Sequence, residues 1–145
     1  MTRDALMARW SEIGEKLVRL AGAFPEDKFE FRAAPGVRSF AEQLRHVAFW
    51  NQYLVQTMQG KAADGEANEL PRHTYPTKPK IVAVLKQSFD GVTAQLARAG
   101  TSPDLSDQES VVGFIEHNGE HYGQLVVYCR LNGLVPPTSQ ASESS

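Results

Sequence analysis

The stretch that decides the fold of this chain runs from Ser39 to Ala48 and reads Ser-Phe-Ala-Glu-Gln-Leu-Arg-His-Val-Ala. Ser39 and Glu42 have the spacing of a capping box, in which the serine hydroxyl accepts from a first-turn amide and the glutamate accepts from the serine amide. Apolar residues then recur at three- and four-residue spacing: Leu44, Val47, Leu54 and Met58. This pattern predicts an amphipathic helix over residues 40–59.

Three other segments have the same helical periodicity: residues 3–23, 77–99 and 106–132. Thr77 is a candidate N-cap, and Gly100 is expected to end the helix that follows it. Ser106 and Glu109 have the spacing of a second capping box, and Gly133 is a candidate C-cap. Because no segment has a convincing strand pattern, we predict an all-α fold, a four-helix bundle.

The domain organisation follows from where these helices stop. We predict a single four-helix bundle domain over residues 1–135. Residues 136–145 are rich in serine and contain no large apolar residue after the two prolines, so we expect a disordered tail there. The polar connection over residues 61–76 is long for a compact domain, and we interpret it as either mobile or functional.

The composition excludes several classes of partner. The chain has 145 residues and a net charge of −2, so no basic bias indicates nucleic acid or an anionic membrane. No apolar run approaches the roughly 20 residues that span a bilayer. The single cysteine, Cys129, cannot form an internal disulfide, and we expect it in the core. We therefore predict a cytoplasmic protein with no nucleic-acid or membrane partner.

Two histidines mark the last predicted helix. His117 and His121 are four residues apart, so both project from one helical face, where they can share a metal ion. His46, in the helix that begins after Ser39, could supply a third ligand, although spacing alone does not bring it to the pair. The alternative is that each histidine is a hydrogen-bonded core residue. Asn118 follows His117, so the HExxH motif of zinc proteases is absent.

Three glycines interrupt the same helix: Gly113, Gly119 and Gly123. Each costs about 1 kcal/mol relative to alanine in a helix interior. We interpret them as positions where a neighbouring backbone approaches closely, or as a flexible or kinked helix.

Several segments resemble a known family when they are taken in order. Residues 35–39 and 44–48 resemble its "PxGxRS" segment and the histidine that follows it. His117 together with Gly119–Leu125 resembles its H-x-x-x-H-x-G-Q segment, and Leu131–Pro137 resembles its usual ending. Over nearly its whole length the chain resembles the DinB-like (DinB/YfiT-like) proteins.

This resemblance implies a four-helix bundle that holds a divalent metal through three histidines. His46, His117 and His121 match the ligand positions, and zinc or nickel is the expected ion. Family members often dimerise, so a homodimer is expected. Characterised relatives include thiol-dependent transferases, such as bacillithiol and mycothiol users, and maleylpyruvate isomerase.

Five further residues are candidates for the surroundings of such a site. Gln124 is a candidate hydrogen-bond partner of a ligand, or a packing residue. Glu42 is expected to be the helix cap rather than a general base, and no catalytic acid or base is identified. Three aromatic residues could line a pocket, although packing is the favoured interpretation: Trp50, Tyr53 and Tyr122. His73 is expected at the surface.

Two functions follow from these patterns. The first is a divalent-metal-dependent enzyme whose open coordination position activates a thiol cosubstrate or water, as in an S-transferase or a hydrolase. The alternative is a non-enzymatic metal-binding or stress-response bundle, with a structural or vacant site. The substrate is not indicated by the sequence.

Overall fold

The computed structural model describes residues 1–98 and 104–143. Four long helices make up the fold: α1 (Arg3–Ala23), α2 (Phe40–Met58), α3 (Lys78–Arg98) and α4 (Leu105–Leu131). Two short helices, η1 (Glu26–Lys28) and α5 (Pro137–Glu143), complete the described secondary structure. The described residues contain no strand, so the predicted all-α four-helix bundle is confirmed. The expected stop at Gly100 lies outside the described residues.

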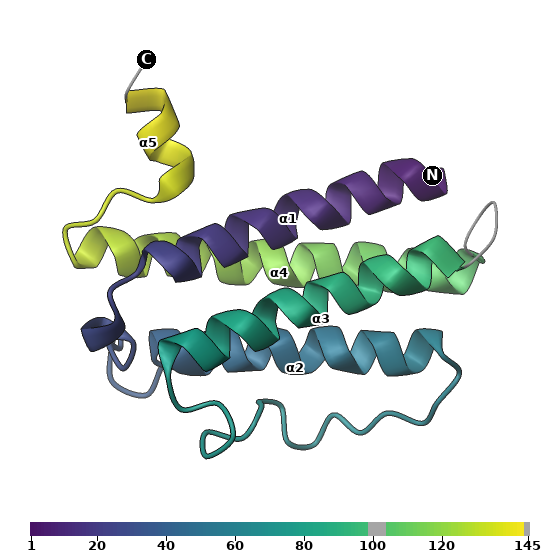
Figure 1. The fold of residues 1–145 in the computed structure, drawn as a ribbon, viewed down its shortest axis with the longest axis horizontal. Helices are drawn as coiled ribbons and strands as arrows, with labels where there is room; N and C mark the ends of the chain where they lie inside the picture. The colour runs from purple at the N-terminus through teal and green to yellow at the C-terminus, as the bar shows by residue number, and fades with distance from the viewer. Residues whose placement is uncertain (99–103, 144–145) are drawn as a thin grey trace.

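Each long helix packs against two others. Contacts join α2 to α3 and α4, and join α1 to α3 and α4. Figure 1 shows that α2 and α3 run in the same direction, whereas α1 and α4 run in the opposite one. The connection between α2 and α3, residues 59–77, therefore has to return along the whole length of the bundle. This return path explains why the connection is long, and it carries the chain past the candidate site.

The ends of the helices agree with the capping signals, with one difference. Both hydrogen bonds of the capping box are present between Ser39 and Glu42. Helix α4, however, is capped by Asp104, whose Oδ1 accepts from the amide of Asp107 at 2.8 Å. The capping box predicted at Ser106 is wrong, because a carboxylate two residues earlier accepts the first-turn amide and interacts favourably with the helix dipole.

Gly133 ends α4 as predicted. It has a φ of 73°, which glycine adopts without strain. Its amide donates to the carbonyl of Arg130 at 3.0 Å, and the amide of Leu134 donates to the carbonyl of Cys129 at 2.9 Å. These two bonds form a Schellman motif, which satisfies carbonyls that the helix end would leave free.

The core lies between the four helices and contains their apolar stripes. Phe24 and Phe40 stack with their ring centroids 3.8 Å apart where the chain turns from α1 into α2. Trp10 is fully buried, and its Nε1 donates to the carbonyl of Phe89 at 3.0 Å. Cys129 is 2% exposed, which confirms the prediction that it is a core residue.

The expectation for the three glycines of α4 differs from the structure. A Cβ added at Gly113, Gly119 or Gly123 would meet no neighbouring atom of the described residues within 4 Å, so the predicted close backbone approach is wrong. All three glycines are exposed on α4. Residues 137–143 form helix α5, and the hydroxyl of Tyr122 lies 2.7 Å from that of Thr138. None of the described helices has the length and hydropathy of a membrane span.

Candidate metal centre

The structure brings the three predicted histidines together, two from α4 and one from α2. The Nε2 atom of His117 lies 3.2 Å from Nε2 of His46 and 3.2 Å from Nε2 of His121. The three ligand atoms all lie within 4.8 Å of one another. His117 and His121 are one turn apart on a helix that packs against α2, and this packing brings His46 to the pair.

Hydrogen bonds at the other ring nitrogens orient two of these imidazoles. Nδ1 of His46 lies 2.7 Å from the carbonyl oxygen of Asn68, and Nδ1 of His121 lies 3.0 Å from Oε1 of Gln43. A carbonyl or amide oxygen only accepts, so each Nδ1 carries the proton and each Nε2 has a free lone pair. Metal-binding histidines are usually held in this way.

These lone pairs fit a cation better than they fit one another. His46 and His121 both direct an unprotonated Nε2 at His117, and a proton on His117 Nε2 could satisfy only one of them. Nδ1 of His117 is buried and has no hydrogen-bond partner among the described residues. A cation bound between the three Nε2 atoms would use all three lone pairs at once.

The imidazoles are also neutral at neutral pH, which is the form that binds metal. Burial lowers the pKa of His46 to about 4, opposed by its bond to Asn68 and assisted by the charge of Arg38. Burial, together with the two neighbouring histidines, lowers the pKa of His121 to about 3. The pKa of His117 is lowered too, mainly by burial, and the side chain of Asn118 has a smaller, opposing effect.

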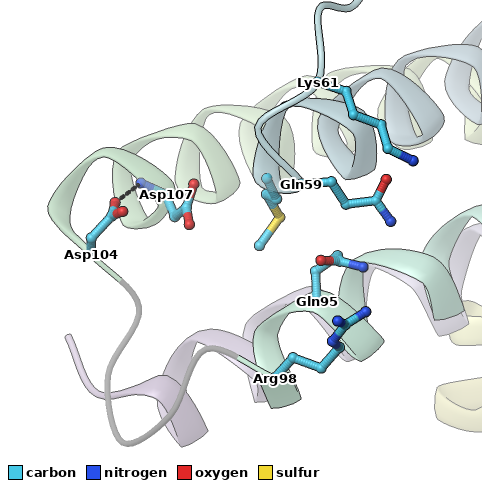
Figure 2. A pocket seen from close by; sticks show the side chains of 7 residues that line it. Gln59, Lys61, Gln95, Arg98, Asp104 and Asp107 are labelled. Carbon is cyan, nitrogen blue, oxygen red and sulfur yellow. Dashed lines mark hydrogen bonds between the residues drawn. The ribbon is translucent and has the colours of Figure 1, made fainter.

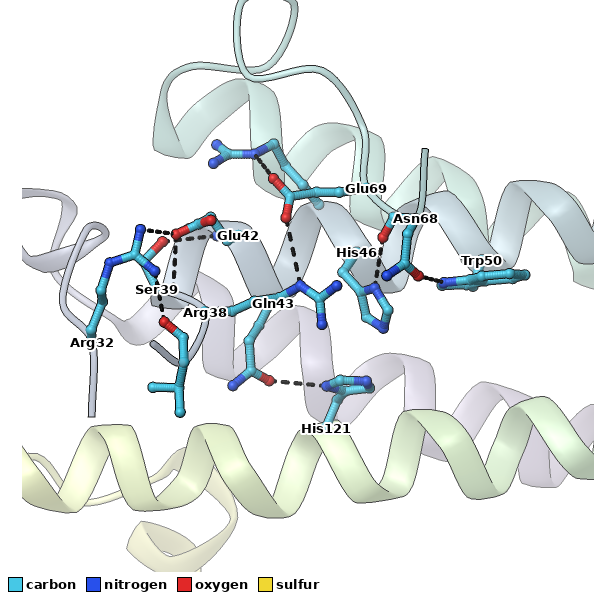
Figure 3. A network of polar contacts seen from close by, with 12 residues as sticks. Arg32, Arg38, Ser39, Glu42, Gln43, His46, Trp50, Asn68, Glu69 and His121 are labelled. Atoms are coloured by element: carbon cyan, nitrogen blue, oxygen red, sulfur yellow. Dashed lines mark hydrogen bonds and ion pairs between the residues drawn. The ribbon is translucent and has the colours of Figure 1, made fainter. Parts of the chain in front are cut away.

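The long connection between α2 and α3 passes beside His46 of this cluster (Figure 3). Besides its carbonyl bond to His46, Asn68 accepts from Nε1 of Trp50 at 2.7 Å through Oδ1. The next residue, Glu69, lies between two arginines, with Nε of Arg38 at 3.6 Å and Nε of Arg45 at 3.5 Å. The segment predicted as mobile or functional is thus fixed against α2 at the histidines.

Arg45 is the anchor of this connection. Its side chain is fully buried, and its Nη1 donates to the carbonyl of Tyr75 at 3.2 Å. Its own carbonyl accepts from the amide of Leu70 at 3.3 Å. One buried residue of α2 therefore holds both halves of the connection.

Glu42 and Gln124 do not hold the histidines. Glu42 caps α2 and forms an ion pair with Arg32, which confirms the capping role. Gln124 is exposed and lies beside His121 in a hollow, but Nδ1 of His121 contacts Gln43 instead. Gln43 precedes His46 by one helical turn on α2, and this spacing was the signal that could have identified it.

Of the aromatic candidates, only Trp50 lies beside the histidines, with its ring centroid 6.5 Å from that of His46. Tyr53 packs against Trp50 with ring centroids 4.9 Å apart and lines a hollow that includes none of the three histidines. Tyr122 bonds to Thr138, and Nζ of Lys16 lies 5.9 Å above its ring. His73 is exposed in the long connection, as predicted.

The comparison with known families agrees with this geometry. A sequence model of the DinB superfamily matches residues 9–125, which include all three histidines. The chain belongs to the DinB superfamily. No curated protein matches the chain significantly. The predicted family is therefore confirmed, and the three-histidine cluster of this DinB-superfamily chain is compatible with a metal site.

Two hollows reach this cluster of the DinB-superfamily chain from different sides. One, of about 760 Å³, has a mixed polar and apolar lining and includes Arg38, Gln43, His121 and Gln124. The other, of about 510 Å³, includes His46 and His117. A third hollow, of about 700 Å³, contains none of the histidines, and Figure 2 shows the acidic, basic and amide side chains around it.

Proposed function

We propose that this chain is a metal-dependent enzyme in which His46, His117 and His121 hold one divalent ion, zinc or nickel. Its reaction would be transfer to a thiol cosubstrate or hydrolysis. One observation carries the proposal: the Nε2 atoms of the three histidines converge. Hydrogen bonds at Nδ1 of His46 and His121 leave the Nε2 lone pairs of these two rings free, and both point at Nε2 of His117.

Three protein ligands leave a coordination position for a substrate, as in catalytic zinc sites. A divalent ion bound there lowers the pKa of a coordinated thiol or water, so that a nucleophile is available at neutral pH. The residues of the chain orient the site: Asn68 and Gln43 fix the rings of His46 and His121. The two adjoining hollows give a reactant access to the Nε2 atoms.

The test of the metal site is elemental analysis of protein expressed without a histidine tag. We expect about one zinc or nickel ion per chain, in line with one tridentate site. His46→Ala, His117→Ala and His121→Ala should each lose most of the metal. His73→Ala is the matched control, because His73 is exposed and far from the cluster in the sequence. Full metal content in the three cluster variants would overturn the assignment.

The second candidate is a non-enzymatic metal-binding or stress-response bundle, and one observation favours it. Two carboxylates beside the cluster are already engaged, Glu42 by Ser39 and Arg32 and Glu69 by Arg38 and Arg45. Chelation discriminates between the two candidates. Loss of the fold on metal removal, with no turnover by the metal-loaded protein on a panel of thiols and electrophiles, favours this second function.

A further inference from the structure

The hollow that reaches His46 and His117 has an unusual lining for a site beside three imidazoles. Its walls are mainly apolar, with Trp50 and Phe114 as the large side chains and their ring centroids 6.4 Å apart. Gly113 lies next to Phe114 in the same wall. The hollow on the His121 side has a mixed lining, in which charged and amide side chains lie beside apolar ones such as Val37. The hollow beside His46 and His117 is therefore the more apolar of the two.

Trp50 is held in place as one wall of the apolar hollow. Its Nε1 donates to Oδ1 of Asn68, so its polar atom is satisfied within the protein. A Cβ added at Gly65 would come within 2.6 Å of the indole ring, so the long connection packs directly on it. A wall that is already ordered loses little conformational entropy when a ligand packs against it.

Gly113 sets the width of the hollow. It is exposed, and an added Cβ there would meet no described atom within 4 Å. Residues 110, 113, 114 and 117 share one face of α4, so a larger side chain at position 113 would enter the space beside Phe114 and His117.

We propose that this hollow binds the apolar, ring-sized part of an organic substrate, whose donor atom reaches the three Nε2 atoms, and that Gly113 determines how large that part can be. This inference names the substrate class of the proposed metal site and rests on that function. The volume of about 510 Å³ accommodates a group such as a phenyl ring.

The test compares two thiols of similar donor chemistry on the cobalt-loaded protein, phenylmethanethiol and 2-mercaptoethanol. Binding is followed by the cobalt absorption spectrum and by tryptophan fluorescence, in which Trp50 changes while the fully buried Trp10 serves as a constant background. Because a phenyl ring buries apolar surface in the hollow, we expect phenylmethanethiol to bind at least about tenfold more tightly.

Gly113→Leu should abolish this preference, because the leucine side chain would occupy the space that the phenyl ring needs. Gly123→Leu is the matched control, since Gly123 lies on the same helix, is equally unobstructed and does not line the hollow. It should retain the preference. Both leucine variants should fold, because leucine is a better helix former than glycine.

The outcomes separate this inference from the proposed function. If no cobalt binds, or if His117→Ala binds it equally well, the proposed metal site fails and the inference fails with it. If cobalt binds at the histidines but the two thiols bind equally, the inference alone is overturned. The same holds if Gly113→Leu and Gly123→Leu have equal effects on the preference.

Discussion

The carbonyl oxygen of Asn68 lies 2.7 Å from Nδ1 of His46, and Asn68 adopts a φ of 60°, the one positive φ among the described non-glycine residues. Asparagine tolerates this left-handed conformation better than most residues do. The backbone of the long connection is thus bent at the point where it accepts a hydrogen bond from a candidate metal ligand. This relationship ties the conformation of a loop to the orientation of an imidazole.

Substitution of Asn68 separates its backbone role from its side-chain role. Asn68→Gly keeps the carbonyl and the positive φ, so metal affinity should fall only a few-fold. Asn68→Val strains the left-handed conformation by about 1–2 kcal/mol and should weaken metal binding by about tenfold or more. Titration against a chromogenic chelator measures both. Equal metal affinities for the two variants would mean that the left-handed conformation at position 68 is not needed for metal binding.

Gln43 should increase the affinity for metal, because it orients the ring of His121. Gln43→Leu removes the acceptor from Nδ1 of His121, and such outer hydrogen bonds are worth about 10–100-fold in metal affinity. Gln43→Glu keeps an acceptor and should bind metal at least as tightly as Gln43→Leu. Gln124→Leu is the control, because Gln124 lies in the same hollow but does not hold a histidine. If Gln43→Leu and Gln124→Leu bind equally, Gln43 has no special role.

Arg45 should contribute more to the free energy of unfolding than an arginine in an exposed ion pair does. Arg45→Met leaves Glu69 with only one arginine and removes the donor to the carbonyl of Tyr75, which should lower the free energy of unfolding by about 2 kcal/mol. Arg72→Met is the matched control, because the pair of Arg72 with Glu30 is exposed and should contribute less than about 1 kcal/mol. Urea denaturation measures both, and similar losses would contradict the anchoring role.

The cap at Glu42 should give a pH dependence at acid pH. Burial tends to raise the pKa of Glu42, but the hydrogen bonds from Ser39 and the charge of Arg32 outweigh it, so the pKa is lowered from 4.5. The folded state therefore binds fewer protons than the unfolded state, and the stabilisation is present above pH 4.5 and lost as the pH falls below it. Glu42→Gln should lose this pH dependence.

Thermal unfolding of the two proteins between about pH 3 and pH 7 checks this, since acid denaturation reflects such carboxylates. The difference in melting temperature between the unmodified protein and Glu42→Gln should shrink as the pH falls. A constant difference would mean that the carboxylate makes no pH-dependent contribution.

The helices could be predicted from the sequence because periodicity and caps are local. The predicted and observed bounds of the first and second helices agree to within one residue, and Ser39 and Gly133 act as expected. The start of α4 differed because two acceptors, Asp104 and Ser106, compete for the same first turn. Local pattern does not decide such a competition.

The partners of the histidines could not be predicted in the same way. The pairing of His46 with Asn68 depends on the path of a connection, and that of His121 with Gln43 depends on how α4 packs against α2. Both are long-range relationships. The close backbone approach predicted at the three glycines of α4 is wrong for a related reason. A small residue indicates either a close neighbour or open space, and only the packing decides between them.

The ligand positions on α2 and α4 also have a consequence for the connectivity of the chain. His46 and His117 are separated by 71 positions, so an ion shared by them closes a covalent-like loop that includes the long connection and all of α3. Because the three ligands come together only in the folded chain, the free energy of ion binding would add to the free energy of unfolding. A chain cut within that loop would therefore stay joined through the ion, and chelation would release its two fragments from that link.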